Sequence, residues 1–336
     1  MSKDTFNEAN YEQAIIELFT QQLGYEYIYG PDIVRDYTEP LFLDRLQQSL
    51  LAINPALPAV AIQEAIDKIR QIDTGSLVQR NEVFTDYLQN GVDVSYFDGK
   101  EQHSACVRLI DYDHPLHNNF VVANQWSIEE HSVRRADIIV FINGLPLVVM
   151  ELKSPSRTET NVSEAYAQLR NYMQEIPSLF VYNAFCVMSD LVTSKAGTIT
   201  SGEDRFMEWK TVDGQTEDNH FANFHVLFCG MFEQERLIEI IRDFICFSKD
   251  EKQSAKRRPD TLCSTVGRRI LYRKLPHCTE GNRYRRINVT AADSTERVNQ
   301  DHDGQTESGG DAKQVSAFAK HADRSASNKD QKKSAD

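Results

Sequence analysis

Two apolar runs joined by a turn signal constrain the fold of this chain more than any other feature. Residues 137–153 read DIIVFINGLPLVVMELK, with branched apolar residues on both sides of an Asn-Gly pair. Asn-Gly between apolar runs is a strong signal for a β-hairpin. Because side chains alternate between the two faces of a strand, runs that are apolar at every position predict strands covered on both faces.

Helices and further strands are expected on both sides of this hairpin, between about residues 8 and 250. Apolar residues spaced three and four apart predict helices, which lie over residues 9–24, 40–53, 58–72, 80–91, 162–176 and 231–247. Clustered or alternating apolar residues predict strands, which lie over residues 104–111, 120–128 and 179–190 and near 195–201. The expected fold is α/β, with a mixed central β-sheet flanked by helices and an N-terminal helical part.

The composition places the chain among globular proteins without a membrane span. Of its 336 residues, 40% are hydrophobic, and no run approaches the roughly 18–20 apolar residues of a transmembrane helix. The start, MSKDTFNEANYEQ, lacks the apolar centre of a signal peptide, so we expect a cytoplasmic protein. The six cysteines show no spacing typical of zinc sites, and His114 and His117 are expected at the surface without metal-ligand spacing.

Charge divides the chain into two parts near residue 250. Residues 1–250 carry 19 Lys+Arg and 38 Asp+Glu, a net charge of −19, whereas residues 251–336 carry 18 and 12, a net charge of +6. From about residue 279 the second part has too few apolar residues to offset its ordering entropy, so we expect disorder there. The acidic first part argues against a broad basic surface that coats DNA but leaves a local basic groove open.

Three ionisable residues stand at one end of the hairpin, although burial makes charge costly there. A two-residue turn alone would place Asp137 and Glu151 on opposite faces, whereas a three-residue loop centred on Gly144 would pair them. Pro146 cannot donate to the hydrogen-bond ladder, which favours an irregular pairing. We therefore predict an unusual loop or a bulge that gathers Asp137, Glu151 and Lys153 into one pocket.

Such a pocket has a chemical use and an ordinary structural alternative. The carboxylates of Asp137 and Glu151, with the backbone carbonyl of Leu152, would form a hard oxygen site suited to Mg²⁺. Lys153 would orient an attacking water or neutralise developing charge. The alternative is an ion pair between Lys153 and Glu151 at a strand end, with Asp137 in a turn.

The pattern D…ELK after a buried hairpin resembles the core of PD-(D/E)XK nucleases. The longer text is similar to the N-terminal nuclease domain of the restriction (R, HsdR) subunit of type I restriction-modification enzymes. Four separated blocks occur in the order of that family, over residues 7–33, 120–126, 134–155 and 164–190. The resemblance covers about residues 8–247 and implies a restriction-endonuclease-like fold.

The resemblance implies roles for particular residues. Asp137 and Glu151 match the carboxylates that bind the metal, taken as Mg²⁺, and Lys153 matches the catalytic lysine. Gln168 and Tyr172 match a Gln-x-x-x-Tyr pair on the following helix, where a spacing of four residues places both on one face. For this last pair, an ordinary polar helix face remains the alternative interpretation.

Other residues near the motif are weaker candidates. Glu12, on the first helix, is a candidate for an extra acidic contact or is an ordinary solvated glutamate. Arg134 and Arg135 are candidates for phosphate contacts or form a solvated pair. Ala136 stands where the family has a proline, a change that removes a rigid turn but no ligand.

The full R subunit of the family continues into an ATP-dependent translocase, which needs a phosphate-binding loop GxxxxGK[ST]. This sequence is not found in the chain, and residues 251–336 are predicted to be a basic tail, disordered or read out of frame. The resemblance implies double-stranded DNA and the methyltransferase and specificity subunits as partners, with ATP required only by the full-length enzyme. Three hypotheses stay open: the Mg²⁺-dependent endonuclease domain of an R subunit, a non-catalytic remnant that only binds the complex, and a free-standing nuclease.

Overall fold

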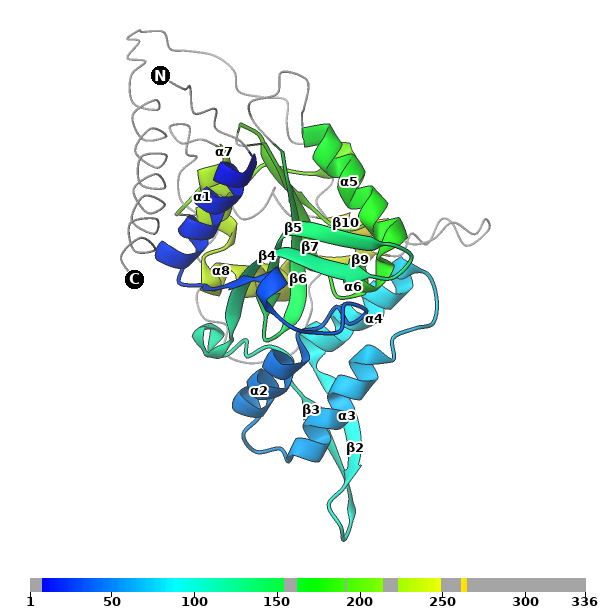
Figure 1. Cartoon of the computed structure of the whole chain (residues 1–336). Helices are drawn as coiled ribbons and strands as arrows, with labels where there is room; N and C mark the ends of the chain where they lie inside the picture. Colours follow the sequence, from blue (N-terminus) through cyan, green and yellow to red (C-terminus); the bar gives the residue numbers. More distant parts are fainter. Residues whose placement is uncertain (1–7, 154–161, 191, 214–222, 249–260, 265–336) are drawn as a thin grey trace, which may run out of the picture.

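The computed structural model describes residues 8–153, 162–190, 192–213, 223–248 and 261–264. Within these residues the centre is a six-stranded sheet with the strand order β1-β4-β5-β6-β7-β8 (Figure 1). The pairs β1–β4 and β6–β7 are parallel and the other three are antiparallel. The strands are β1 Glu26–Tyr29, β4 Phe120–Glu129, β5 Val133–Ile142, β6 Leu145–Leu152, β7 Phe185–Ser189 and β8 Ser194–Gly197. The predicted mixed α/β sheet is confirmed.

Helices cover both faces of this sheet, which explains the unbroken apolar runs of β5 and β6. One core lies between the sheet and a group of six helices, namely α1 Glu8–Gln21, α2 Leu43–Ile53, α3 Ala59–Arg70, α4 Leu77–Asn90, α7 Asn223–Met231 and α8 Gln234–Asp243. The second core lies beneath α5 Val162–Glu175 and α6 Pro177–Val181. Figure 1 shows α5 on one side of the sheet and α1, α7 and α8 on the other.

The central hairpin has a two-residue turn, and a bulge in β6 shifts the pairing register by one residue. Val140 pairs with Val148, so Leu147 is left as the extra residue of a β-bulge in β6. This shift places Asp137 and Glu151 at the same level of the ladder and on the face covered by α5. The predicted bulge is therefore confirmed.

Two predicted elements are wrong in their extent. The apolar run 179–190 was expected as one strand, but its beginning belongs to α6, with Pro177 in the first turn, and only Phe185–Ser189 forms β7. A short apolar run does not distinguish a buried helix from a strand. The helix expected over 231–247 is wrong at both ends, since Met231 ends α7, α8 spans only Gln234–Asp243 and Ile245–Ser248 is a strand. The Glu233 carboxylate caps α8 by accepting from the amides of Glu235 and Arg236.

Smaller elements complete the described part of the chain. Strands β2 Val92–Phe97 and β3 Gln102–Val107 form a separate antiparallel pair, and only β3 was expected. In the predicted tail, Thr261–Ser264 forms β10 and pairs with β9 Ile245–Ser248; the remaining predictions for 251–336 lie outside the described residues. None of the helices in the described ranges is long and apolar enough to cross a membrane.

The turn of the central hairpin is packed tightly against the start of α2. Asn143 and Gly144 have φ values of 53° and 81°, as a type I′ turn requires. The Phe42 amide donates to the Gly144 carbonyl at 2.9 Å. A Cβ on Gly144 would lie 2.5 Å from the backbone nitrogen of Leu46. The turn therefore needs glycine for both its conformation and its space.

Replacing Gly144 by alanine should lower the free energy of unfolding by about 3 kcal/mol, since it adds overpacking to the left-handed strain. Gly99→Ala is the matched control, because Gly99 also has a positive φ of 97° but has open space around its Cβ position. It should cost only about 1 kcal/mol. Guanidinium denaturation followed by circular dichroism measures both; equal losses would contradict the packing argument.

Candidate active site

The two carboxylates predicted from the hairpin lie together at its open end, away from the turn. Glu151, in β6, has only 1% of its side chain exposed. Asp137, in β5, accepts a hydrogen bond from the Leu152 amide through Oδ2 at 2.8 Å. This bond ties the Asp137 carboxylate to the strand that carries Glu151, so the hairpin itself fixes the pair.

Lys153 is held by three acceptors. Its Nζ donates to Glu151 Oε1 at 2.6 Å, to the Leu152 carbonyl at 3.1 Å and to Gln168 Oε1 at 3.0 Å. The side chain is 12% exposed, so water weakens these contacts little. The contact between Lys153 and Glu151 that was the structural alternative therefore exists, but Gln168 also anchors the ammonium from a different element.

The Gln168–Tyr172 pair on α5 faces the carboxylates. Gln168 Nε2 donates to the Tyr172 hydroxyl at 2.6 Å, and that hydroxyl donates to the Arg135 carbonyl at 3.1 Å. The chain of hydrogen bonds thus runs from β5 through α5 to Lys153. All five residues predicted for the site are brought together, although their chemical roles stay predictions.

A second group of side chains adjoins Asp137 and was only partly expected. The Glu12 carboxylate accepts from Asn124 Nδ2 at 2.5 Å and from Gln125 Nε2 at 2.8 Å. Gln125 has a φ of 54°. Its neighbours Asn124 and Trp126 pair with β5 on either side of Asp137, but Gln125 itself does not pair. Such a backbone position is uncommon outside glycine. Sequence reasoning missed Gln125, although two amides within an apolar strand were a signal.

Burial raises the pKa values of both carboxyl groups. The pKa of Glu151 rises to about 9, first because of burial and then because of the charge of Asp137, against the opposing effects of Lys153 and of the nearby Tyr172 hydroxyl. Burial likewise raises the pKa of Asp137 to about 6, although the hydrogen bond from Leu152 and the charge of Lys153 lower it. Glu151 Oε2 is buried and accepts no hydrogen bond from the described part of the chain. A bound cation would satisfy this oxygen and offset the cost of the two charges.

A cavity of about 880 Å³ adjoins the Asp137 carboxylate. Asp137, Gln168 and Tyr172 line it, together with Arg134 and Arg135. Arg134 forms an ion pair with Glu175, which also lines the cavity. The two arginines are therefore at the site, as the weaker prediction required, but carboxylates accompany them.

The sequence of this chain matches a known protein family. The family described as "Type I restriction enzyme R protein N terminus (HSDR_N)" matches residues 5–205. The chain belongs to this family. This assignment confirms the resemblance predicted from the four sequence blocks, including the segment that carries the carboxylates.

Individual relatives of this chain support the same family assignment. It is 36% identical to the Type I restriction enzyme HindI endonuclease subunit of Haemophilus influenzae, over 73% of this chain and 24% of that protein. It is 29% identical to the putative type I restriction enzyme MjaIXP endonuclease subunit of Methanocaldococcus jannaschii, over 76% of this chain and 27% of that protein. The chain thus spans about a quarter of the length of these relatives.

The raised pKa of Glu151 predicts how stability depends on pH in the metal-free protein. The folded state holds this proton up to about pH 9, whereas the unfolded state releases it near its ordinary value of 4.5. Wild-type stability should therefore fall as pH rises between these values. Glu151→Gln should raise Tm by several degrees at pH 8 and by progressively less toward pH 4.5.

Thermal unfolding across pH, with a chelator present, measures this difference. Glu239→Gln is the matched control, because Glu239 lies on the exposed side of α8 and its change should leave the pH profile unaltered. A difference in Tm between wild type and Glu151→Gln that stays constant from pH 4.5 to pH 8 would contradict the assignment.

Proposed function

We propose that this chain is the nuclease domain of a type I restriction enzyme R subunit, a Mg²⁺-dependent endonuclease with a PD-(D/E)XK core. It hydrolyses phosphodiester bonds of double-stranded DNA in defence against foreign DNA. The observation that carries the proposal is the convergence of Asp137, Glu151 and Lys153 at one end of a buried hairpin, beside a cavity. The family assignment and the names of the relatives, which are endonuclease subunits, support the same chemistry.

The residues present fit a magnesium ion. Asp137 and Glu151 would hold it with carboxylate oxygens. The Leu152 carbonyl, next to Glu151 on β6, would supply a third oxygen. Glu151 Oε2 in particular is a buried acceptor that lacks a hydrogen bond among the described residues. When bound, Mg²⁺ supplies a Lewis acid that lowers the pKa of its water and stabilises charge on phosphate oxygens.

Lys153 places a positive charge at the site, and Gln168 and Tyr172 on α5 position it. The Lys153 ammonium, fixed by Glu151 and Gln168, places a positive charge at the carboxylates, where it orients water and offsets the negative charge that develops on a scissile phosphate. Gln168 holds the ammonium, and Tyr172 holds Gln168. The cavity admits the phosphate, and Arg134 and Arg135 line the wall nearest the start of β5.

The proposed context is the larger enzyme. The chain spans about a quarter of the length of the relatives it matches. By the family resemblance, the methyltransferase and specificity subunits would choose the DNA, and ATP would act on the translocase part of an R subunit. The net charge of −19 over residues 1–250 disfavours broad DNA binding by this chain alone, so delivery of DNA by such partners would assist cleavage. Action on DNA inside the cell implies a cytoplasmic location.

Cleavage of supercoiled plasmid by the purified full chain tests the proposal. With Mg²⁺ or Mn²⁺, the wild type should nick the plasmid slowly, and Asp137→Ala and Lys153→Ala should each lower the rate at least 100-fold. The first change removes a metal ligand, and the second removes the positive charge beside the phosphate. Lys210→Ala is the matched control, since Lys210 is an exposed lysine that pairs only with neighbouring Glu208 among the contacts described. Its rate should equal that of the wild type.

Two results would count against this proposal. Nicking that persists in Asp137→Ala and Lys153→Ala would place the activity elsewhere or in a contaminant. A folded wild type that binds Mn²⁺ but never nicks DNA would favour the alternative, a remnant that retains the fold without the activity.

A further inference from the structure

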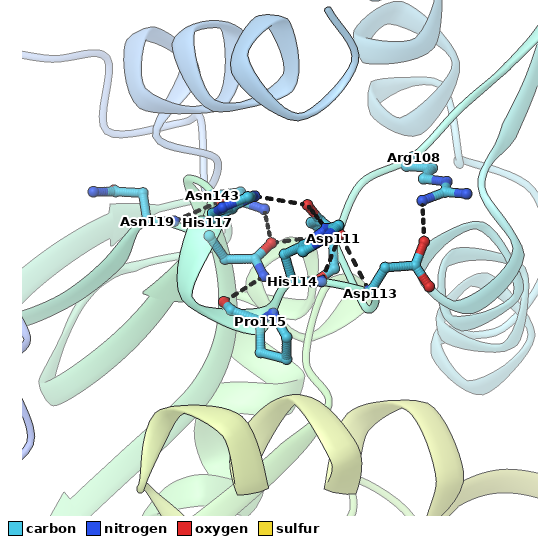
Figure 2. A network of polar contacts seen from close by, with 9 residues as sticks. Arg108, Asp111, Asp113, His114, Pro115, His117, Asn119 and Asn143 are labelled. Carbon is cyan, nitrogen blue, oxygen red and sulfur yellow. Dashed lines mark hydrogen bonds and ion pairs between the residues drawn. The ribbon is translucent and has the colours of Figure 1, made fainter. Parts of the chain in front are cut away.

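A second polar cluster lies between β3 and β4, near the turn of the central hairpin. It consists of Asp111, His114 and His117 (Figure 2). The Nδ1 atoms of His114 and His117 lie 3.5 Å and 3.3 Å from Asp111 Oδ2. One ligand atom from each residue lies within 4.8 Å of the others. Sequence reasoning placed both histidines correctly at the surface but found no metal-ligand spacing.

The spacing becomes meaningful through the local backbone. Pro115–His117 forms a single 3₁₀ turn, with His114 directly before it. The His114 carbonyl accepts a hydrogen bond from the His117 amide at 2.9 Å, which brings the two residues close together. Their rings stack with centroids 4.8 Å apart and planes 18° apart. The pattern D-x₂-H-x₂-H thus gives a convergent group through the fold of this turn.

The carboxylate of this cluster is fixed in advance. Asp111 is 8% exposed, and its Oδ1 accepts from the amides of Asp113 at 3.1 Å and His114 at 3.0 Å. Asn118 Nδ2 donates to the Asp111 carbonyl, and Asn143 Nδ2 donates to Asn118 Oδ1 at 2.7 Å. The hairpin turn thus anchors the loop, and Asp111 Oδ2 is left facing the two imidazoles.

We infer that Asp111, His114 and His117 form a binding site for a divalent transition-metal ion, of which Zn²⁺ is the best match. Zinc–nitrogen and zinc–oxygen bonds of about 2.0–2.2 Å in a tetrahedron place neighbouring ligand atoms roughly 3.3–3.5 Å apart. The two distances from Asp111 Oδ2 fall in this range. Two imidazoles and one carboxylate suit zinc better than Mg²⁺, and the fourth position stays open to water.

The charges around the cluster permit a cation. Arg108 is paired with Asp113 at 2.7 Å, and Arg242, which lies over the Tyr112 ring, is paired with Asp243.

This site is separate from the proposed nuclease centre. Asn143, to which the loop is tied, is in the turn of the hairpin, whereas Asp137 and Glu151 are at its open end. Bound zinc would clamp the 111–118 loop and stabilise the folded chain by mass action. It would neither supply nor replace the metal of the carboxylate pair.

Titration of the full chain with Zn²⁺, followed by calorimetry under reducing conditions, tests the inference. The wild type should bind one more Zn²⁺ ion per chain than His114→Ala/His117→Ala. If both proteins bind the same number of Zn²⁺ ions, the wild type should bind one of them about tenfold or more tightly. Co²⁺ in place of Zn²⁺ should give visible d–d absorption that the double variant lacks. Because the chain has six cysteines and nine histidines, the difference between variants is the diagnostic quantity.

Three further proteins separate the explanations. His103→Ala/His131→Ala, which removes two histidines from other elements, should keep the zinc equivalent. Asp137→Asn should also keep it, so that failure of the nuclease proposal does not affect this result. His117→Asn should lose it while keeping a polar side chain and the metal-free Tm. Zinc binding that is the same in wild type and in the His114/His117 variants would overturn the inference.

Discussion

The level pairing of Asp137 with Glu151 across the central hairpin is the constraint on which the rest of the site depends. A two-residue turn alone would place these carboxylates on opposite faces of the sheet. The extra residue Leu147 shifts the register by one and turns both toward α5. Because a slip of one residue reverses every side chain, the bulge decides whether the site exists.

The same pairing imposes an energetic cost. Two carboxyl groups are close together in a buried strand pair, and the pKa of each is raised. Lys153 offsets only part of this cost, since Glu151 Oε2 stays without a hydrogen bond in the described structure. A fold selected only for stability would replace such a group with an apolar residue. The cost is understandable if a cation binds there.

How much could be predicted from the sequence depended on whether the deciding interaction was local. The hairpin, its bulge and the five residues at its open end followed from apolar runs, from Pro146 and from the family resemblance. The split of residues 179–190 into α6 and β7 did not, because an apolar run fits either element until its packing is known. Gln125 was missed because its left-handed backbone arises from pairing with β5.

The histidine cluster shows the same limit from another side. His114 and His117 were correctly expected at the surface, but their convergence on Asp111 depends on a 3₁₀ turn and on Asn143, a residue 26 positions beyond His117. Sequence spacing alone describes neither. Local sequence patterns therefore do not predict a cluster whose loop is anchored by a residue far along the chain.

Direct measurement of metal binding at the carboxylate pair tests the central claim most simply. Electron paramagnetic resonance should count the Mn²⁺ ions bound by the wild type and by the double variant Asp137→Asn/Glu151→Gln at pH 8, where Mn²⁺ replaces Mg²⁺ on oxygen ligands. If the carboxylates hold the catalytic metal, the wild type binds at least one ion that the variant does not. Equal binding by the two proteins, both folded, would contradict the account.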